Sequence, residues 1–299
     1  MQDITQEIQR LKKERNAIIL AHNYQLPEVQ DIADFRGDSL ELSRIASETD
    51  ADIVVFCGVH FMAETASILC ADKTVLIPDS KAGCPMANMI NVKDLIELKN
   101  RHPKAIIVGY VNTSAEVKAE LDVCCTSTNA VALVSKLKEE EIIFVPDKYL
   151  ADYVSKKTGR RLISWDGYCP THVKILPEDI IKKIRQHPKA RVLIHPECTP
   201  EVIALADEVL STGKMCKYAA ESEGKEFIIG TEVGIIHRLK QDNPQKEFYP
   251  ASELAVCPNM KKINLEKILW SLQDLKEEVK VSQEVRKRAM RSIERMVSV

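Results

Sequence analysis

Three Cys-Pro dipeptides divide this sequence into lengths of nearly equal size. They are Cys84-Pro85, Cys169-Pro170 and Cys257-Pro258, so that successive cysteines lie 85 and 88 residues apart. Each dipeptide closes a stretch in which short apolar segments alternate with segments of helical character. A pattern that recurs along a chain indicates one structural unit built several times. We therefore predict three related units, with a cysteine at the equivalent corner of each.

A second set of residues repeats in the same register. In each unit a glutamate is followed six residues later by an aspartate, and the aspartate five residues later by a hydroxyl residue. The three sets are Glu28, Asp34 and Ser39, then Glu116, Asp122 and Ser127, then Glu201, Asp207 and Thr212. The tetrapeptide His102-Pro103-Lys104-Ala105 also recurs as His187-Pro188-Lys189-Ala190. Several agreements in one register favour internal triplication over chance.

Short apolar runs alternate with stretches of helical periodicity, which begin with an amphipathic helix over Ile4–Arg15. This alternation is typical of βα units whose parallel sheets are buried on both faces. The predicted strands are Ala17–Ala21, Ile53–Cys57, Thr74–Ile77, Ala105–Tyr110, Glu141–Val145, Arg191–His195 and Glu226–Gly230. The predicted fold class is α/β, with three pseudo-threefold-related α/β/α domains whose short parallel sheets surround a central cavity.

The repeat also predicts the domain boundaries. Unit one is expected to comprise residues 1–84 together with 258–299, because the helical tail over Asn264–Val299 would return to cover it. Unit two then comprises residues 85–169 and unit three residues 170–257. No Gly/Ser-rich linker separates the units, so we expect them to pack tightly.

Composition excludes several classes of function. The 299 residues are 45% hydrophobic, and a net charge of −2 gives no electrostatic case for binding nucleic acid or an anionic membrane. The longest apolar runs are too short to span a bilayer, and the polar N-terminus does not read as a signal peptide. Nine cysteines in such a chain indicate a reducing, cytoplasmic location, where metal binding or catalysis is expected rather than disulfides.

Polar side chains follow the first strand of every unit, at the sheet edge where ligands collect in parallel α/β folds. Counting back six residues from each repeated glutamate gives His22, Tyr110 and His195, and counting back four gives Tyr24, Asn112 and Glu197. The hydroxyl residues Ser39, Ser127, Ser211 and Thr212 lie near predicted helix starts, which suit phosphate or carboxylate. Three such corners around one axis predict a polar, anion-binding chamber.

The repeated cysteines are candidate metal ligands. Three thiolates from Cys84, Cys169 and Cys257 would leave a coordination position free for substrate, which is typical of a catalytic metal site. Spacing does not distinguish zinc from iron, since both accept thiolates. The other cysteines, Cys57, Cys70, Cys124, Cys125, Cys198 and Cys216, are interpreted as small core residues. Cys198 adjoins Glu197, and the sequence assigns it no role.

Eight short motifs together resemble the quinolinate synthase (NadA) family over essentially the whole chain. They are Ala21-His22-Asn23-Tyr24-Gln25, Gly37-Asp38-Ser39, Cys84-Pro85-Met86-Ala87-Asn88, Tyr110-Val111-Asn112, Thr126-Ser127, His195-Pro196-Glu197-Cys198, Ser211-Thr212-Gly213 and Cys257-Pro258-Asn259-Met260-Lys261-Lys262. The resemblance implies a triangular protein of three pseudo-symmetric domains. It also implies a transferase that condenses iminoaspartate with dihydroxyacetone phosphate to quinolinate, phosphate and water in NAD biosynthesis.

The same resemblance implies a cofactor and a set of site residues. An oxygen-sensitive [4Fe–4S] cluster would be held by Cys84, Cys169 and Cys257. Iminoaspartate would come from L-aspartate oxidase or aspartate dehydrogenase. The implied site residues are His22, Tyr24, Ser39, Tyr110, Asn112, Ser127, His195, Glu197, Ser211 and Thr212. Some members carry a redox disulfide just after the third ligand, but Pro258, Asn259 and Met260 stand there in this chain.

Two other classes of function stay open from the residues. Glu197 is the best candidate for a general base, with Tyr24, Tyr110 and His22 as further catalytic candidates. A zinc-dependent lyase or aldolase acting on a phosphorylated small molecule could use the same three thiolates. A non-catalytic Fe–S sensor would need no polar chamber, so the polar residues at the strand ends count against it.

Overall fold

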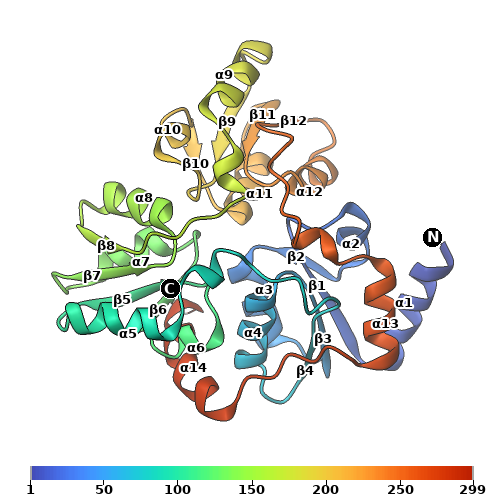
Figure 1. The fold of residues 1–299 in the computed structure, drawn as a ribbon. Helices are drawn as coiled ribbons and strands as arrows, with labels where there is room; N and C mark the ends of the chain where they lie inside the picture. Colours follow the sequence, from blue (N-terminus) through green and yellow to red (C-terminus); the bar gives the residue numbers. More distant parts are fainter. Residues whose placement is uncertain (1, 298–299) are drawn as a thin grey trace.

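Three four-stranded parallel sheets form the framework of the computed structural model, which describes residues 2–297. Figure 1 shows each sheet with its own helices as one of three lobes around a common centre. The strands of the first sheet are β1 (Ala17–His22), β2 (Phe35–Gly37), β3 (Ile53–Cys57) and β4 (Thr74–Leu76). Those of the second are β5 (Ile106–Tyr110), β6 (Val123–Cys125), β7 (Ile142–Val145) and β8 (Leu162–Ser164). Those of the third are β9 (Arg191–Ile194), β10 (Glu208–Val209), β11 (Glu226–Gly230) and β12 (Glu247–Pro250).

All three sheets have the same topology. Their strand orders are β2-β1-β3-β4, β6-β5-β7-β8 and β10-β9-β11-β12, so the first strand of each unit lies inside its sheet. The paired strands run parallel throughout. The α/β fold class with three similar units is therefore confirmed. Strands β3 and β11 have the predicted bounds, and β3 is an uninterrupted apolar run that is buried at every position.

Helices connect the strands and cover the sheets. In unit one they are α1 (Gln2–Glu14), α2 (Pro27–Ile32), α3 (Ser39–Glu48) and α4 (His60–Leu69). In unit two they are α5 (Val92–Arg101), α6 (Ala115–Lys118), α7 (Ala130–Lys136) and α8 (Lys148–Thr158). In unit three they are α9 (Pro177–Gln186), α10 (Pro200–Ile203), α11 (Thr212–Glu221) and α12 (Ile235–Asp242). Three short 3-10 helices, η1 (Ala87–Met89), η2 (His172–Lys174) and η3 (Met260–Lys262), follow the Cys-Pro dipeptides.

The repeated aspartates join the edge strands to the sheets. Each carboxylate accepts a hydrogen bond from a backbone N–H of the central strand: Asp34 from Ile19 at 2.7 Å, Asp122 from Ile107 at 2.8 Å and Asp207 from Val192 at 2.7 Å. The backbone N–H of each aspartate donates in turn to the carbonyl of the same partner, at 2.9, 3.1 and 2.9 Å. The edge strands that follow, β2, β6 and β10, have only two or three residues. These three edge strands were not predicted, because strands this short show no periodicity in the sequence.

The C-terminal helices cover two units rather than one. Helix α13 (Leu265–Asp274) contacts α1, where Arg15 Nη2 donates to the Gln273 carbonyl at 2.8 Å. Helix α14 (Gln283–Val297) contacts α3 and α4 but also packs on β6 and α6 of unit two, as Figure 1 shows. There Ser292 Oγ donates to the Lys118 carbonyl at 2.9 Å. The expectation that the tail returns to unit one therefore describes α13, whereas α14 joins units one and two. The proposed domain boundaries stay a prediction.

No helix within residues 2–297 combines the length and the apolar character that crossing a membrane requires.

Candidate active site

A cavity of about 170 Å³ lies where the carboxyl ends of strands from all three units meet. Most residues selected from the sequence line it: His22, Tyr24, Ser39, Cys84, Tyr110, Asn112, Ser127, Cys169, His195, Glu197, Thr212 and Cys257. The position after a parallel strand is where a side chain can face a ligand without interrupting the sheet. The cavity therefore brings together residues that are far apart in the sequence.

Ser211 does not line this cavity. It is the N-cap of α11, where its hydroxyl accepts from the Lys214 N–H at 3.4 Å. Its Oγ also lies 2.7 Å from Thr128 Oγ1, which is 2.6 Å from Asp38 Oδ2. These three side chains come from units three, two and one. Ser211 thus lies at a junction of the units beside the cavity, and its contact with substrate stays a prediction.

The three cysteine corners have the same local structure. Each cysteine lies three residues before a 3-10 helix, and its carbonyl accepts from the N–H four residues on, at 3.3 Å in all three cases. The backbone N–H groups two and three residues on act to lower the pKa of each thiol, in the pairs Met86 and Ala87, Thr171 and His172, Asn259 and Met260. Proline is suited to the position after each cysteine, because it has no backbone N–H that would need a partner and its fixed φ fits the turn. The Cys-Pro repeat therefore encodes the same turn at each cysteine.

Burial opposes ionisation of these thiols. It raises the pKa of Cys84 to about 12, and it raises the pKa values of Cys169 and Cys257 as well. Negative charge on Glu197 adds to the effect at Cys84 and Cys169. A bound cation supplies the positive charge that such thiols need, and a coordinating thiol is deprotonated outright. The set of three thiols on one cavity is therefore suited to a metal centre.

A second, tighter donor cluster adjoins one of these cysteines. His172 Nδ1 lies 3.1 Å from Cys169 Sγ and 2.8 Å from Glu197 Oε2, and the ligand atoms of the three residues all lie within 4.8 Å of one another. Sequence reasoning missed His172, although it stands three residues after a predicted ligand. Its equivalents in the repeat, Ala87 and Met260, are apolar, so only the corner of Cys169 carries an ionisable group there.

Glu197 is the most constrained carboxylate of the cavity. It is 3% exposed, the Tyr110 hydroxyl donates to its Oε1 at 2.5 Å, and His172 contacts its Oε2. Burial alone would raise the pKa of Glu197, but His172 and the hydrogen bonds from His172 and Tyr110 hold that pKa below its usual range. Glu197 is therefore ionised at neutral pH and can accept a proton, whereas burial and this charge raise the pKa of Tyr110 well above its ordinary value.

Two histidines of the cavity are built alike. The Nδ1 atom of His22 accepts from the Tyr24 N–H at 3.2 Å, and that of His195 accepts from the Glu197 N–H at 3.4 Å. Burial lowers the pKa of His22 to about 4 and that of His195 to about 3, so both rings are neutral at neutral pH. A neutral ring that accepts at Nδ1 carries its proton on Nε2. Each histidine therefore offers an N–H donor rather than a positive charge.

Tyr24 belongs to a hydrogen-bonded group on the unit-three side. Its hydroxyl lies 2.5 Å from Thr231 Oγ1 and 3.4 Å from His172 Nε2, which itself is 2.7 Å from Thr231 Oγ1. Burial and the charge of Glu197 raise the pKa of Tyr24 well above its ordinary value. Tyr24 is therefore a protonated phenol, connected through His172 to Glu197.

Glu232 is a further residue that the sequence analysis missed. It is fully buried two residues after β11 and lines the cavity. Its carboxylate accepts from the Cys257 N–H at 3.0 Å and pairs with Lys261 Nζ at 3.0 Å, while Lys261 also donates to the Tyr24 carbonyl. This pair attaches the third cysteine corner to the strand end of unit one. Glu232 could have been predicted from its position just after a buried strand. That rule was used only for the first strand of each unit, and β11 is not the first strand of unit three.

The cysteines interpreted as small core residues are away from this cavity lining. Cys57, Cys70, Cys124, Cys125 and Cys198 are buried, and Cys216 is partly buried. Cys198 Sγ lies 3.5 Å from the Gly230 carbonyl, inside the small core of unit three. All nine cysteines are free thiols.

Fold and site together define a class: a three-unit parallel α/β protein whose single-chain cavity combines cysteine thiols, neutral histidines and an ionised glutamate. Sequence comparison places the chain within that class. The sequence profile described as "NadA: Quinolinate synthetase A protein" matches residues 6–298. The chain belongs to the quinolinate synthase family, and it is accordingly an enzyme, which excludes the non-catalytic sensor hypothesis.

Relatives named quinolinate synthase match this chain in sequence over nearly their full length. Quinolinate synthase of Dehalococcoides mccartyi (strain CBDB1) is 56% identical over 296 residues, which cover 99% of this chain and 98% of the relative. That of Methanosarcina barkeri (strain Fusaro) is 53% identical over 297 residues, with the same coverage. That of Thermodesulfovibrio yellowstonii is 55% identical over 295 residues, covering 98% of this chain and 97% of the relative.

Proposed function

We propose that this enzyme condenses iminoaspartate with dihydroxyacetone phosphate to give quinolinate, phosphate and water, as a step of NAD biosynthesis. Relatives named quinolinate synthase share 53–56% of its residues over nearly the whole chain. The structural observation that carries the proposal is the convergence of Cys84, Cys169 and Cys257 on one cavity that also holds neutral donors and an ionised glutamate. Such a cavity suits an anionic substrate that must lose water and phosphate.

The spacing of the three thiols supports a multi-iron cluster over a single ion. A zinc ion holds sulfur at about 2.3 Å, so two thiolates on one zinc are at most about 4.6 Å apart. Within residues 2–297, the sulfurs of Cys84, Cys169 and Cys257 do not form a group within 4.8 Å of one another. In a [4Fe–4S] cluster each thiolate would bind a separate iron, which allows wider spacing. The iron without a protein ligand would supply Lewis-acid chemistry that favours loss of water.

Neutral donors are proposed to hold the carboxylates and the phosphate. The Nε2–H groups of His22 and His195 and the hydroxyls of Ser39, Ser127 and Thr212 lie in the cavity lining. Ser39 and Thr212 are the first residues of α3 and α11, so both hydroxyls stand at a helix start. Asn112 adds an acceptor, because its buried Oδ1 has no hydrogen-bond partner among the described residues. A substrate hydroxyl or imine N–H would satisfy that atom.

Glu197 is proposed as the general base. Its carboxylate is ionised, and each of its oxygens already faces a group that can exchange protons, Tyr110 at Oε1 and His172 at Oε2. Glu197 would take a proton from the substrate, while Tyr110 and His172, which donate to its two oxygens, hold the carboxylate in place. Tyr24 and Tyr110 remain protonated and are suited to donate to a leaving group. Exclusion of water from these buried side chains strengthens each interaction.

A zinc-dependent lyase or aldolase is the second candidate, and one observation favours it. Cys169, His172 and Glu197 form a compact set of sulfur, nitrogen and oxygen ligands that a single zinc could bind. This arrangement would leave Cys84 and Cys257 without a role in ligation, although their corners are built like that of Cys169.

An anaerobic assay tests both candidates on the same sample. Iminoaspartate is generated in place by L-aspartate oxidase or aspartate dehydrogenase, dihydroxyacetone phosphate is added, and quinolinate is measured together with iron, acid-labile sulfide and zinc. We expect quinolinate with about four irons per chain. Stoichiometric zinc in active protein would contradict the cluster proposal.

We also propose a cytoplasmic location, supported by the nine free thiols.

A further inference from the structure

Thr212 differs from the two hydroxyl residues that occupy the same position in the repeat. Its Oγ1 lies 3.0 Å from the side-chain Nδ2 of Asn23, which follows β1 in unit one. Within residues 2–297, the hydroxyls of Ser39 and Ser127 have no hydrogen-bond partner. The positions equivalent to Asn23 are Val111 and Pro196, which carry no amide. The supported hydroxyl is therefore confined to the corner between units one and three.

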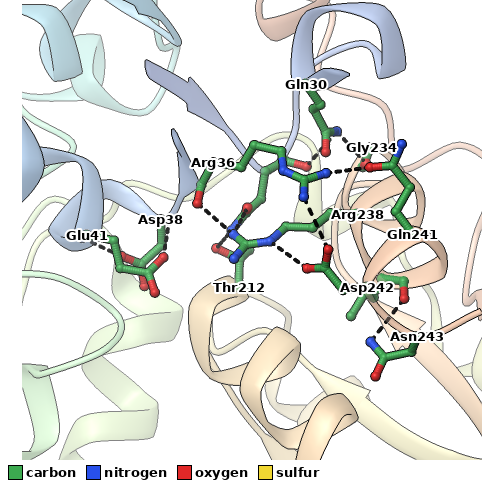
Figure 2. Close-up of polar contacts among 12 residues, drawn as sticks. Gln30, Arg36, Asp38, Glu41, Thr212, Gly234, Arg238, Gln241, Asp242 and Asn243 are labelled. Atoms are coloured by element: carbon green, nitrogen blue, oxygen red, sulfur yellow. Dashed lines mark hydrogen bonds and ion pairs between the residues drawn. The ribbon is translucent and has the colours of Figure 1, made fainter. Parts of the chain in front are cut away.

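Arg238 determines which way the Asn23 amide faces. Its Nη1 donates to Asn23 Oδ1 at 2.7 Å and to the Arg36 carbonyl at 2.9 Å, and Figure 2 shows its side chain reaching from α12 between Arg36 and Thr212. A guanidinium has only donors, so the atom of Asn23 that meets it must be the oxygen. The amide nitrogen then faces Thr212 and donates to it.

The consequence is a hydroxyl whose proton is free for a ligand. Thr212 Oγ1 accepts from Asn23, and no acceptor for the Thr212 O–H is present in the part of the chain that the structure describes. The side chain is 3% exposed and lines the cavity. A buried hydroxyl that already accepts one hydrogen bond uses its proton as a donor when an acceptor arrives.

We propose that Arg238 is a positioning residue that, through Asn23, presents the Thr212 hydroxyl as a hydrogen-bond donor to an anionic group of the substrate. This inference rests on the proposed function, because it requires a carboxylate or phosphate in the cavity. Arg238 itself is held by Asp242, whose Oδ2 lies 3.2 Å from its Nε and whose Oδ1 lies 3.2 Å from Arg36 Nη2. The contact between units one and three thereby determines a property of the site.

Asn23→Asp is the most informative substitution. Aspartate keeps the size of the side chain and its pairing with Arg238, but it has no N–H, so the Thr212 hydroxyl would donate to it instead of to the ligand. We expect the affinity for quinolinate, measured by calorimetry on anaerobically prepared holoenzyme, to fall about tenfold or more. Arg238→Met leaves the amide free to turn and should cause a smaller loss. Unchanged affinity in Asn23→Asp overturns the inference.

Thr212→Val separates the proposed relay from simple charge repulsion. If Asn23 acts through the hydroxyl, Asn23→Asp should cause no further loss of affinity in the Thr212→Val background, as in a double-mutant cycle of coupled residues. An equal loss in both backgrounds would mean that the new carboxylate repels the ligand, and the inference would be wrong.

Arg36→Met is the matched control. It removes a cation that contacts Gln241 and Asp242 in the same interface but leaves the backbone carbonyl of residue 36 and the Asn23 amide in place. We expect wild-type affinity and iron content, and a loss as large as that of Arg238→Met would overturn the inference. A further outcome is that the wild type binds quinolinate and the variants show the expected changes in affinity, while no quinolinate is formed in the assay. In that case the proposed reaction fails and the positioning role stands. If it binds neither quinolinate nor inorganic phosphate, both fail.

Discussion

The three cysteine corners and the three strand-end corners of this molecule come from the same repeat, yet they have diverged to different degrees. At the cysteine corners, the proline, the 3-10 helix and the 3.3 Å backbone hydrogen bond are the same in every unit. At the strand ends, equivalent positions hold His22, Tyr110 and His195, or Tyr24, Asn112 and Glu197. Both kinds of corner line the same cavity.

This difference separates two demands on one site. A metal centre with three protein ligands of one kind needs the same ligand geometry three times, and a repeated unit supplies it. A substrate with different groups at its ends needs a different partner at each corner, so the strand-end residues must differ. We infer that the symmetric part of the cavity is suited to the cofactor and the asymmetric part to the substrate.

The largest effect is expected at the cysteine corners. Cys84→Ser, Cys169→Ser and Cys257→Ser should each abolish broad visible absorbance and quinolinate formation together, because every thiolate would bind one iron of the same cluster. Cys57→Ser and Cys70→Ser, whose side chains are outside the cavity lining, should keep both. A cysteine corner that tolerates serine would show that the three are not equivalent.

The next largest effect on turnover is expected at one strand-end residue, Glu197, which has no equivalent glutamate in the other two units. Glu197→Gln keeps the shape of the side chain but accepts a proton poorly, so turnover should fall by about 10²-fold or more. Iron content and quinolinate affinity serve as controls and should be retained. Near-wild-type turnover would transfer the proposed role of base to another of the polar residues, with Tyr24 or His22 to be tested next.

The buried histidines predict a pH dependence of stability. Because burial lowers the pKa of His22 to about 4, the unfolded chain binds more protons than the folded chain between about pH 4 and its unfolded value near 6.5. Stability from this group is complete above about pH 6.5 and is lost as the pH falls toward 4, on the order of 2 kcal/mol at pH 5. His22→Gln should be less sensitive to pH over this range in thermal unfolding. An unchanged pH profile in His22→Gln would contradict the neutral, desolvated histidine.

The smallest effect on turnover is expected at the repeated aspartates, which are the same in all three units but lie outside the cavity lining. Asp122→Ala and Asp207→Ala each leave a strand N–H without its acceptor and should cost about 1–3 kcal/mol of unfolding free energy, with turnover retained. Asp50→Ala, at an exposed position, is the control and should change stability little. Loss of turnover without loss of stability would assign these aspartates to the site instead.

Sequence alone was sufficient for the parts of this protein that repeat. The steps between Cys84, Cys169 and Cys257 indicated three units, and uninterrupted apolar runs such as Ile53–Cys57 predicted the inner strands, because burial on both faces requires that composition. Local sequence also identified six polar residues of the cavity lining, since the end of a parallel strand is a position that can be counted along the chain: His22, Tyr24, Tyr110, Asn112, His195 and Glu197. The roles of those residues remain predictions.

Only the tertiary structure decided the features that depend on contacts between units. Tyr110 of unit two donates to Glu197 of unit three, and Arg238 acts on Thr212 only through Asn23 of unit one. Helix α14 packs on both unit one and unit two, although the sequence pattern suggested unit one alone. Hydrogen bonds and buried ion pairs form between atoms that no local periodicity relates, so their partners depend on how the three units pack.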